Sequence, residues 1–180
     1  PKFRYHVADR VVNFHDNYVC AVVAFDGVMY EAISNNVLEI DFDTLNRVYT
    51  EAAREKAGRL AFHCYQLRRK IEVNTRFEFS NGFCQSFADK YLQRFNDKDY
   101  YENQFYISIL LKFDESIDEA IADIESVLES FVVKLQKYQP RVLTAYENEQ
   151  GVLSSEIYEF FYEIFNSEKS LGSFPITGTP

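Results

Sequence analysis

The sequence is poor in the residues and motifs that mark several protein classes. Its 180 residues include no tryptophan, one methionine, four prolines and six glycines, which excludes collagen-like and low-complexity chains. No stretch approaches the ~18 consecutive apolar residues of a membrane-spanning helix. We expect no cleavable signal, because charged residues interrupt the first ten positions. What remains, 47% hydrophobic and 26% charged residues, is the profile of a globular domain that can bury its own core.

Cysteine is scarce, and its placement indicates free thiols. Cys20, Cys64 and Cys84 are odd in number, widely spaced and form no C-x-x-C pair, which is typical of a reducing compartment. Free cysteines are most often buried, so we expect Cys64 to be a core thiol and Cys84 to be in or near the core. His63 precedes Cys64 on an expected strand, where neighbours point to opposite faces, so the two are not predicted to act as a nucleophile pair. His6 and His15 lie near the start and have no evident partners in the sequence.

Motifs that carry catalysis or cofactor binding are missing. None of the six glycines is followed by lysine, so the chain has no phosphate-binding loop, and it has no G-x-G-x-x-G dinucleotide cradle. It also lacks H-E-x-x-H, a cysteine cluster, an EF-hand loop and a nucleophile elbow. We therefore predict no catalytic, cofactor-binding or metal-binding residue.

The net charge of −9 comes entirely from the second half of the chain. Residues 1–90 hold 12 basic and 12 acidic residues, whereas residues 91–180 hold 7 basic and 16 acidic ones. An acidic surface repels phosphate, which disfavours direct binding of nucleic acid or anionic lipid. The surplus of acidic residues either keeps the protein soluble or forms a surface that binds a basic partner. The acidic run over 114–129 either suits the dipole of a helix or forms an acidic docking face, and no pair of carboxylates stands out for hydrolysis.

The first half of the chain predicts alternating strands and helices. Residues 17–25 (NYVCAVVAF) and 28–34 (VMYEAIS) flank Asp26-Gly27, which predicts a hairpin. Helical spacing then predicts a helix starting at Asp43 or Thr44 and stopping at Gly58. Residues 60–71 (LAFHCYQLRRKI) indicate a strand. Residues 80–95 follow as a helix capped by Ser80, with one face of aromatic residues.

The second half continues this pattern. Residues 105–113 (FYISILLKF) are almost uniformly apolar, which predicts a central strand buried on both faces. Ser116-x-x-Glu119 is a capping box that opens a long helix, which ends before Pro140. A short strand over 141–146 and a last helix starting at Ser154 or Ser155 follow, and residues after Asn166 are expected to be loop or tail.

These elements predict an α+β (mixed α/β) fold with one mostly antiparallel or mixed sheet, an N-terminal hairpin and about four helices packed against it. We expect an N-terminal extension over 1–16, a single domain over 17–166 and a tail or linker start over 167–180. Because the chain starts with proline rather than methionine, it is expected to be a piece of a longer polypeptide or a processed chain.

Two clusters are candidate partner contacts. Arg68, Arg69 and Lys70 form the one compact basic cluster of the sequence; at a strand end it is either a solvated edge or a contact to phosphate or to a partner. Tyr100 and Tyr101 lie in a polar connection, where an exposed contact is expected. Most of the 13 tyrosines and 17 phenylalanines are expected in the core.

Several motifs occur in an order that resembles a known family. They are 62–70 (FHCYQLRRK), Phe83…Tyr91…Phe95, 103–109 (NQFYISI), 140–144 (PRVLT), 151–161 (GVLSSEIYEFF) and 166–168 (NSE). The order and spacing, from about residue 17 to 170, are similar to the amino-terminal domain of the CagE/TrbE/VirB family of ATPases, which energise bacterial type IV secretion systems.

The resemblance implies an assembly module rather than the motor. In that family the nucleotide site lies in a carboxyl-terminal RecA-like domain, so ATP and magnesium are expected only there and no catalytic residue carries over to this chain. The implied location is the cytoplasmic side of the bacterial inner membrane, reached through protein partners. The implied partners are other secretion subunits, including small inner-membrane proteins and further ATPase copies, without membrane insertion or nucleic-acid binding.

Two other functions remain open at this point. A stand-alone small-molecule enzyme or binding protein would carry a deep pocket between sheet and helices, with convergent polar groups and shifted pKa values. An unrelated scaffold protein is the third alternative.

Overall fold

The chain divides into two compact units. The computed structural model describes residues 3–28, 33–71, 76–96, 100–114, 116–169 and 172–176. Residues 1–65 and 105–180 form one unit, called here the sheet unit, and residues 66–104 form a second, called the inserted unit. The predicted domain boundaries at residues 16 and 166 stay a prediction.

A six-stranded sheet forms the centre of the fold. Its strands are β1 (Phe3–Ala8), β2 (Val11–Phe14), β3 (Tyr18–Phe25), β4 (Leu60–Ile71), β5 (Tyr100–Lys112) and β6 (Pro140–Val142). The order is β1-β2-β3-β5-β4, and β6 pairs with β3. The pairings of β3 with β2, β5 and β6 are all antiparallel. A second, two-stranded sheet consists of β7 (Ala145–Glu147) and β8 (Leu153–Ser155).

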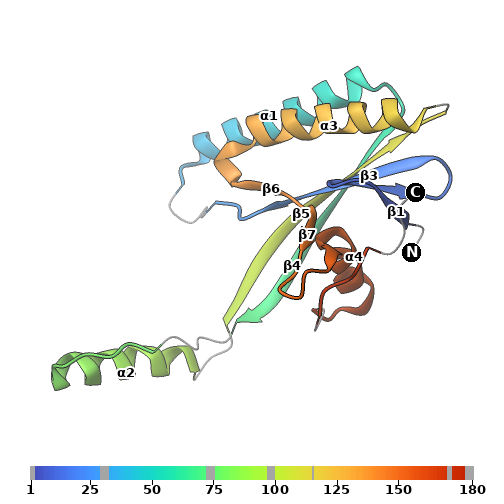
Figure 1. The fold of residues 1–180 in the computed structure, drawn as a ribbon. Coiled ribbons are helices and arrows are strands. Elements are labelled where there is room, and N and C mark those ends of the chain that lie inside the picture. The colour runs from blue at the N-terminus through green and yellow to red at the C-terminus, as the bar shows by residue number, and fades with distance from the viewer. Residues whose placement is uncertain are drawn as a thin grey trace. The chain divides into compact units, whose positions relative to one another are not determined.

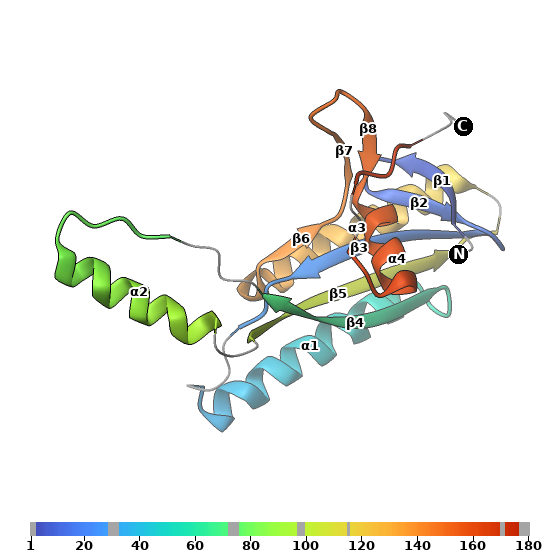
Figure 2. The same ribbon diagram turned by 90° about the horizontal axis from the view of Figure 1, so that it is seen from below.

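Helices cover both faces of this sheet. Figures 1 and 2 show α1 (Asn35–Glu55) and α3 (Ile117–Lys134) on one face and α4 (Glu156–Asn166) on the other. The fourth helix, α2 (Gly82–Asn96), belongs to the inserted unit. Four helices and a mostly antiparallel sheet confirm the α+β class. Among the described residues, no helix is both long and apolar enough to cross a bilayer.

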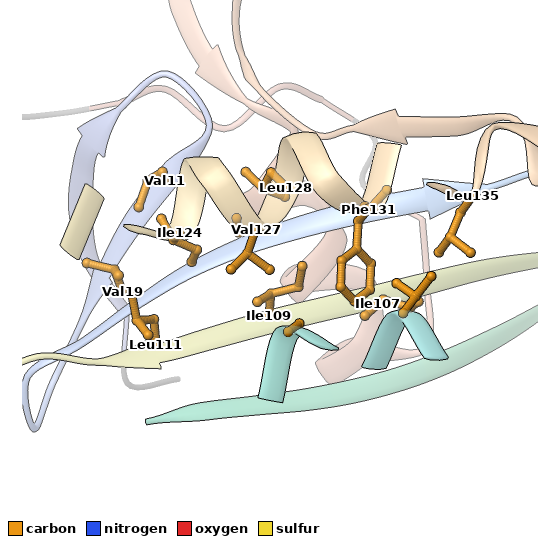
Figure 3. Packing of buried hydrophobic residues seen from close by; sticks show 14 of the residues in the cluster. Val11, Val19, Ile107, Ile109, Leu111, Ile124, Val127, Leu128, Phe131 and Leu135 are labelled. Atoms are coloured by element: carbon orange, nitrogen blue, oxygen red, sulfur yellow. The ribbon is translucent and has the colours of Figure 1, made fainter. Parts of the chain in front are cut away.

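The main core lies between the sheet and the pair α1 and α3. Because successive strand residues point to opposite faces, Val19, Ala21 and Val23 of β3 join this core, whereas Cys20 and Val22 face the other side. Figure 3 shows side chains of α3 pointing toward Ile107 and Ile109 of β5. Full burial of such a side chain stabilises the fold by about 1.5–3 kcal/mol.

Two predicted helix starts are confirmed by their hydrogen bonds. The backbone N–H of Glu119 donates to Ser116 Oγ at 3.3 Å, and the N–H of Tyr158 donates to Ser155 Oγ at 3.1 Å. Each bond satisfies a donor that the first turn of a helix leaves without a partner. The helix α3 ends at Lys134, and a short 3-10 helix η1 (Gln136–Tyr138) leads to Pro140.

The predicted hairpin around Asp26-Gly27 is wrong. Gly27 has the expected positive φ of 78°, but Val28, Ile33 and Ser34 lie in no strand, and residues 29–32 lie outside the described part of the chain. The N-terminal hairpin is formed instead by β1 and β2, within the segment that was expected to precede the domain. Local turn chemistry could not show that β3 pairs with β5, which lies far along the chain and matches it over the whole strand.

Several boundaries also differ from the expectation. The helix α1 begins at Asn35 rather than near Asp43, and the strand predicted over 141–146 is broken into β6 and β7. The strand β4 spans the predicted residues, and β5 is an inner strand as predicted but begins earlier, at Tyr100. Past the last helix, the N–H of Ser155 donates to the carbonyl of Phe174 at 2.9 Å, so part of the expected tail pairs with β8.

The assignment of the core predicts that removing one aromatic ring strongly lowers the stability of the fold. Phe131 of α3 is 0% exposed and packs against the rings of Tyr49 and Phe62, with centroids 5.7 and 5.3 Å away. Phe131→Ala is expected to lower the free energy of unfolding by about 3–5 kcal/mol, because it removes these contacts and leaves a cavity. Urea unfolding followed by circular dichroism measures the change.

The matched control lies two residues further along the same helix. Val133 is 72% exposed, so Val133→Ala is expected to change the free energy of unfolding by no more than about 0.5 kcal/mol. Similar losses for the two variants would contradict the assignment of the buried face of α3.

Candidate interaction surface

Exposed aromatic side chains concentrate in the inserted unit. We call the following set the aromatic surface: Phe77, Phe79, Phe83, Phe87 and Tyr91. Phe83 is 80% exposed, and the other four are each exposed by close to half or more. Together with Cys84 and Ala88 they line a groove of about 320 Å³. Contiguous apolar area of this kind on a folded chain marks an interaction site.

Local hydrogen bonds hold the helix and the segment before it in place. The N–H of Phe83 donates to Asn81 Oδ1 at 2.8 Å, so Asn81, rather than the predicted Ser80, caps α2. The N–H of Phe79 donates to Gln85 Oε1 at 2.9 Å, which ties the preceding segment to the first turn. Phe83, Phe87 and Tyr91 follow one another at intervals of four residues and therefore share one face of α2.

The predicted basic and tyrosine contacts lie on the two strands of the inserted unit. The guanidinium of Arg68 stands over the ring of Tyr101, 4.4 Å from its centroid, and Arg69 donates a hydrogen bond to Gln104 Oε1. The ring of Tyr100 packs on Phe95 of α2 at 4.9 Å. Lys70 follows as an exposed residue of β4. The structure thus joins Arg68 with Tyr101; a role of these five residues in binding a partner stays a prediction.

Sequence reasoning missed the aromatic surface because it placed these rings in the core. The helical spacing of Phe83, Phe87 and Tyr91 was recognised, but spacing alone does not say what covers a face. The expectation of buried thiols is wrong for Cys64 and Cys84, which are both exposed, and confirmed for Cys20. Burial raises the pKa of the Cys20 thiol to about 12, which keeps it protonated and unreactive.

The acidic run on α3 is partly neutralised by distant cations. Lys56 Nζ lies 2.5 Å from one carboxylate oxygen of Asp123, and Arg59 Nη2 lies 3.0 Å from the other. The hydrogen bond from Lys56 is the main reason why the pKa of Asp123 is lowered. Arg10 reaches Glu125 at 3.3 Å. These pairs connect α3 to other elements, so this part of the run serves the fold.

His6 of β1, which had no evident partner in the sequence, is buried against Ser155 at the start of α4. Its Nδ1 donates to the carbonyl of Ala8 at 3.0 Å, and its Nε2 accepts from the hydroxyl of Ser155 at 2.6 Å. Burial lowers the pKa of His6 and so favours the neutral ring that this pattern requires.

The distance between His6 Nε2 and Ser155 Oγ is that of a catalytic dyad, but the serine oxygen is not accessible to a substrate. Ser155 is 0% exposed, and its Oγ also accepts the N–H of Tyr158 as the cap of α4. A nucleophile must reach its substrate, and a fully buried capping oxygen does not. The pair therefore links β1 to the N-terminus of α4.

A pocket between sheet and helices, expected for a small-molecule protein, is present in the sheet unit with a volume of about 340 Å³. The side chains in its lining that carry a polar atom are the thiol of Cys64 and four tyrosines, Tyr49, Tyr65, Tyr106 and Tyr138. The phenol of Tyr49 lies 3.6 Å from the thiol of Cys64. Burial is the main cause that raises the pKa of Tyr49, and the hydrogen bond to the Cys64 thiol is the second cause. This phenol therefore stays protonated. Such a lining can donate hydrogen bonds but supplies no paired acid and base.

The linings of the two hollows offer little to a phosphate group or a metal ion. The aromatic groove and the pocket of the sheet unit are lined without a lysine or arginine that could neutralise phosphate. Across the described ranges, no three His, Cys, Asp or Glu side chains lie close enough together to hold a metal.

The fold and the surface define an α+β domain that presents aromatic side chains on a small inserted unit. The family model for the N-terminal domain of the type IV secretion system ATPase VirB4/TrbE matches residues 10–117, more than half of the chain. The chain belongs to this family, as the order of its motifs implied.

Curated relatives agree with this membership. The type IV secretion system protein virB4 of Bartonella quintana (strain Toulouse) is 24% identical over 186 aligned residues, which cover 91% of this chain and 23% of that protein. Its counterpart in Bartonella henselae (strain ATCC 49882 / DSM 28221 / CCUG 30454 / Houston 1) is 21% identical with the same coverage. The chain therefore spans about a quarter of the length of these relatives.

The buried histidine predicts a pH-dependent stability. Because the pKa of His6 is lowered from its ordinary 6.5 on folding, the unfolded chain binds the proton more tightly. The free energy of unfolding is thus expected to fall as the pH drops from about 7.5 to about 5.5, and His6→Gln is expected to flatten this dependence. Urea unfolding at a series of pH values measures it.

His15 offers the control. Its ring is exposed and accepts a hydrogen bond from Arg4 Nε at 3.0 Å, so His15→Gln is expected to keep the slope of the parent chain. A slope that is unchanged in His6→Gln, or lost equally in both variants, would contradict the assignment of the pH dependence to His6.

Proposed function

We propose that this chain is a non-catalytic assembly domain of a type IV secretion ATPase and that it binds other subunits through the aromatic surface. Membership of the VirB4/TrbE N-terminal family supports the setting. The observation that carries the proposal is the set of exposed aromatic side chains on the inserted unit. Aromatic residues and arginine are the side chains enriched at protein–protein interfaces.

The charge of the inserted unit suits this role. Residues 66–104 hold seven basic and six acidic residues, whereas the rest of the chain holds 12 basic and 22 acidic ones. The aromatic surface therefore lies on a unit that is nearly neutral, where bringing a partner close costs little electrostatic repulsion. Arg68, stacked on Tyr101, supplies a cation of the kind that anchors interfaces.

The partners in this proposal are other secretion subunits, including small inner-membrane proteins and further copies of the ATPase. Its location is the cytoplasmic side of the bacterial inner membrane, reached through these proteins. ATP and magnesium are assigned to parts of the parent protein outside this chain, because neither groove described above offers a phosphate cradle.

Two measurements test the proposal. Binding and turnover of ATP by the purified 180-residue chain are expected to stay at background, because its sequence has no phosphate-binding loop. Specific turnover by the chain would contradict the non-catalytic role.

Capture of the small inner-membrane subunits of the same secretion system is expected to depend on the aromatic surface. The double variant Phe83→Ala/Phe87→Ala is expected to weaken capture by about tenfold or more, because truncated interface anchors each cost about 1–2 kcal/mol. Pull-down from detergent extracts, quantified against bait, measures it.

Phe165→Ala is the matched control for this experiment. Phe165 is also a helix-borne phenylalanine, is 59% exposed and lies outside the aromatic surface. Capture that is lost equally in both variants, or retained in the double variant, would contradict the assigned surface. Circular dichroism confirms that each variant is folded.

A further inference from the structure

The pocket of the sheet unit is open and apolar, and it shares no lining residue with the aromatic surface. Its lining comes from β3, β4, β5, α1 and the loop after β3, and includes Phe25, Leu45, Tyr49, Phe105 and Ile107. Val28 and Phe105 of this lining are partly exposed. A pocket with such walls takes apolar groups.

An apolar stripe continues from this pocket along α1. Leu38, Phe42, Leu45 and Tyr49 follow one another at intervals of four, three and four residues, so they lie on one face of the helix. Leu45 and Tyr49 line the pocket, whereas Leu38 and Phe42, which is 64% exposed, extend the stripe into solvent. Pocket and stripe together form an elongated apolar surface within one unit.

One polar atom at this surface lacks a partner. Tyr138 lines the pocket, and its Oη is buried without a hydrogen bond. A buried hydroxyl without a partner costs free energy. The packing around Tyr138, beside the pocket, is therefore not fully satisfied by the chain's own groups.

Exposed carboxylates lie next to residues of the pocket and of the stripe in the sequence. Asp26 precedes Gly27 in the lining, and Glu39 and Asp43 follow directly after Leu38 and Phe42; all three carboxylates are exposed. Lys137, next to Tyr138, is already bound by both carboxylate oxygens of Asp41 at 2.6 Å. The charge of this surface therefore suits a cationic occupant.

We propose that the pocket and the α1 stripe, Leu38, Phe42, Leu45 and Tyr49, form one docking site for an amphipathic helix of another protein, with an apolar face and a polar face rich in lysine and arginine. This inference rests on the proposed assembly function and adds a second contact, of defined chemistry, to it.

The geometry favours a helix over other occupants. Side chains at spacings of four, three and four residues are the pattern on which a second helix packs, with its own anchors at matching intervals. An anionic bilayer is disfavoured because the exposed carboxylates repel it. A basic polar face meets the same carboxylates favourably and raises the rate of association.

Two exposed cysteines provide a direct readout. Cys64 lines the pocket, whereas Cys84 lines the groove of the inserted unit, and Cys20 is buried. A helix seated in the pocket must shield Cys64 from alkylation and leave Cys84 accessible. Peptide mass spectrometry after a short pulse of maleimide reports both sites in the same sample.

The probe is a fluorescein-labelled peptide of leucine and lysine with helical spacing, about five turns long, at about 0.15 M salt. It is expected to bind the 180-residue chain and to slow alkylation of Cys64 by about tenfold, with Cys84 unchanged. A counterpart with glutamate in place of lysine is expected to bind at least about tenfold more weakly.

Variants test the site itself. Phe42→Ala is expected to weaken binding of the probe by about tenfold, and Phe165→Ala, matched in exposure on α4, is expected to leave it unchanged. Both side chains are largely exposed, so both variants are expected to keep the melting temperature of the parent chain.

Three results would overturn the inference: equal loss of binding in the two variants, equal binding of the two peptides, or binding that leaves Cys64 as reactive as before. Protection of Cys64 that rises with protein concentration in the absence of peptide would assign the site to a second copy of this chain instead. None of these results bears on capture of secretion subunits by the aromatic surface, so the two proposals can fail separately.

Discussion

The fold depends on the burial of β3 on both faces. Val19 to Val23 are fully buried, and β3 is hydrogen-bonded to β2, β5 and β6. A charged side chain on either face of a strand in this position would pay a desolvation cost. Successive residues of the strand point to opposite faces, so they contact different helix layers. One short segment therefore contacts both the layer of α1 and α3 and the layer of α4. A shift of its register by one residue would turn the side chains of each face toward the opposite layer.

The apolar surfaces of the chain divide into those that the fold covers and those that it leaves open. Between the sheet and α3, rings such as Phe131 are completely enclosed. A unit of about 40 residues is too small to enclose its own apolar groups, and the aromatic surface of the inserted unit follows from that limit. The α1 stripe has a different origin, because only the later turns of that helix lie over the sheet core. Contiguous open apolar area of this kind marks a surface that is available for contact.

The titratable groups that attract attention in the sequence act mainly in structure. His6 is kept neutral as it accepts the hydroxyl of Ser155, and Asp123 is held ionised by Lys56 and Arg59. Cations outside α3 lower the pKa of Asp123, whereas burial lowers the pKa of His6, so both shifts report tertiary packing. The apolar lining of both grooves fits the same interpretation.

Local chemistry in the sequence was enough to determine the α+β class, the strand β4, and the helix caps at Ser116 and Ser155, because a cap and a hydrophobic period are decided within a few residues. The ordered motifs were enough to indicate the family. Only the tertiary structure decided that β3 pairs with β5, that His6 meets Ser155 across 149 positions, and that Phe83 and Cys64 are exposed. The physical reason is that periodicity defines an apolar face, whereas its exposure depends on which distant segment packs against it, and the free energy of that packing is shared among residues far apart in the chain.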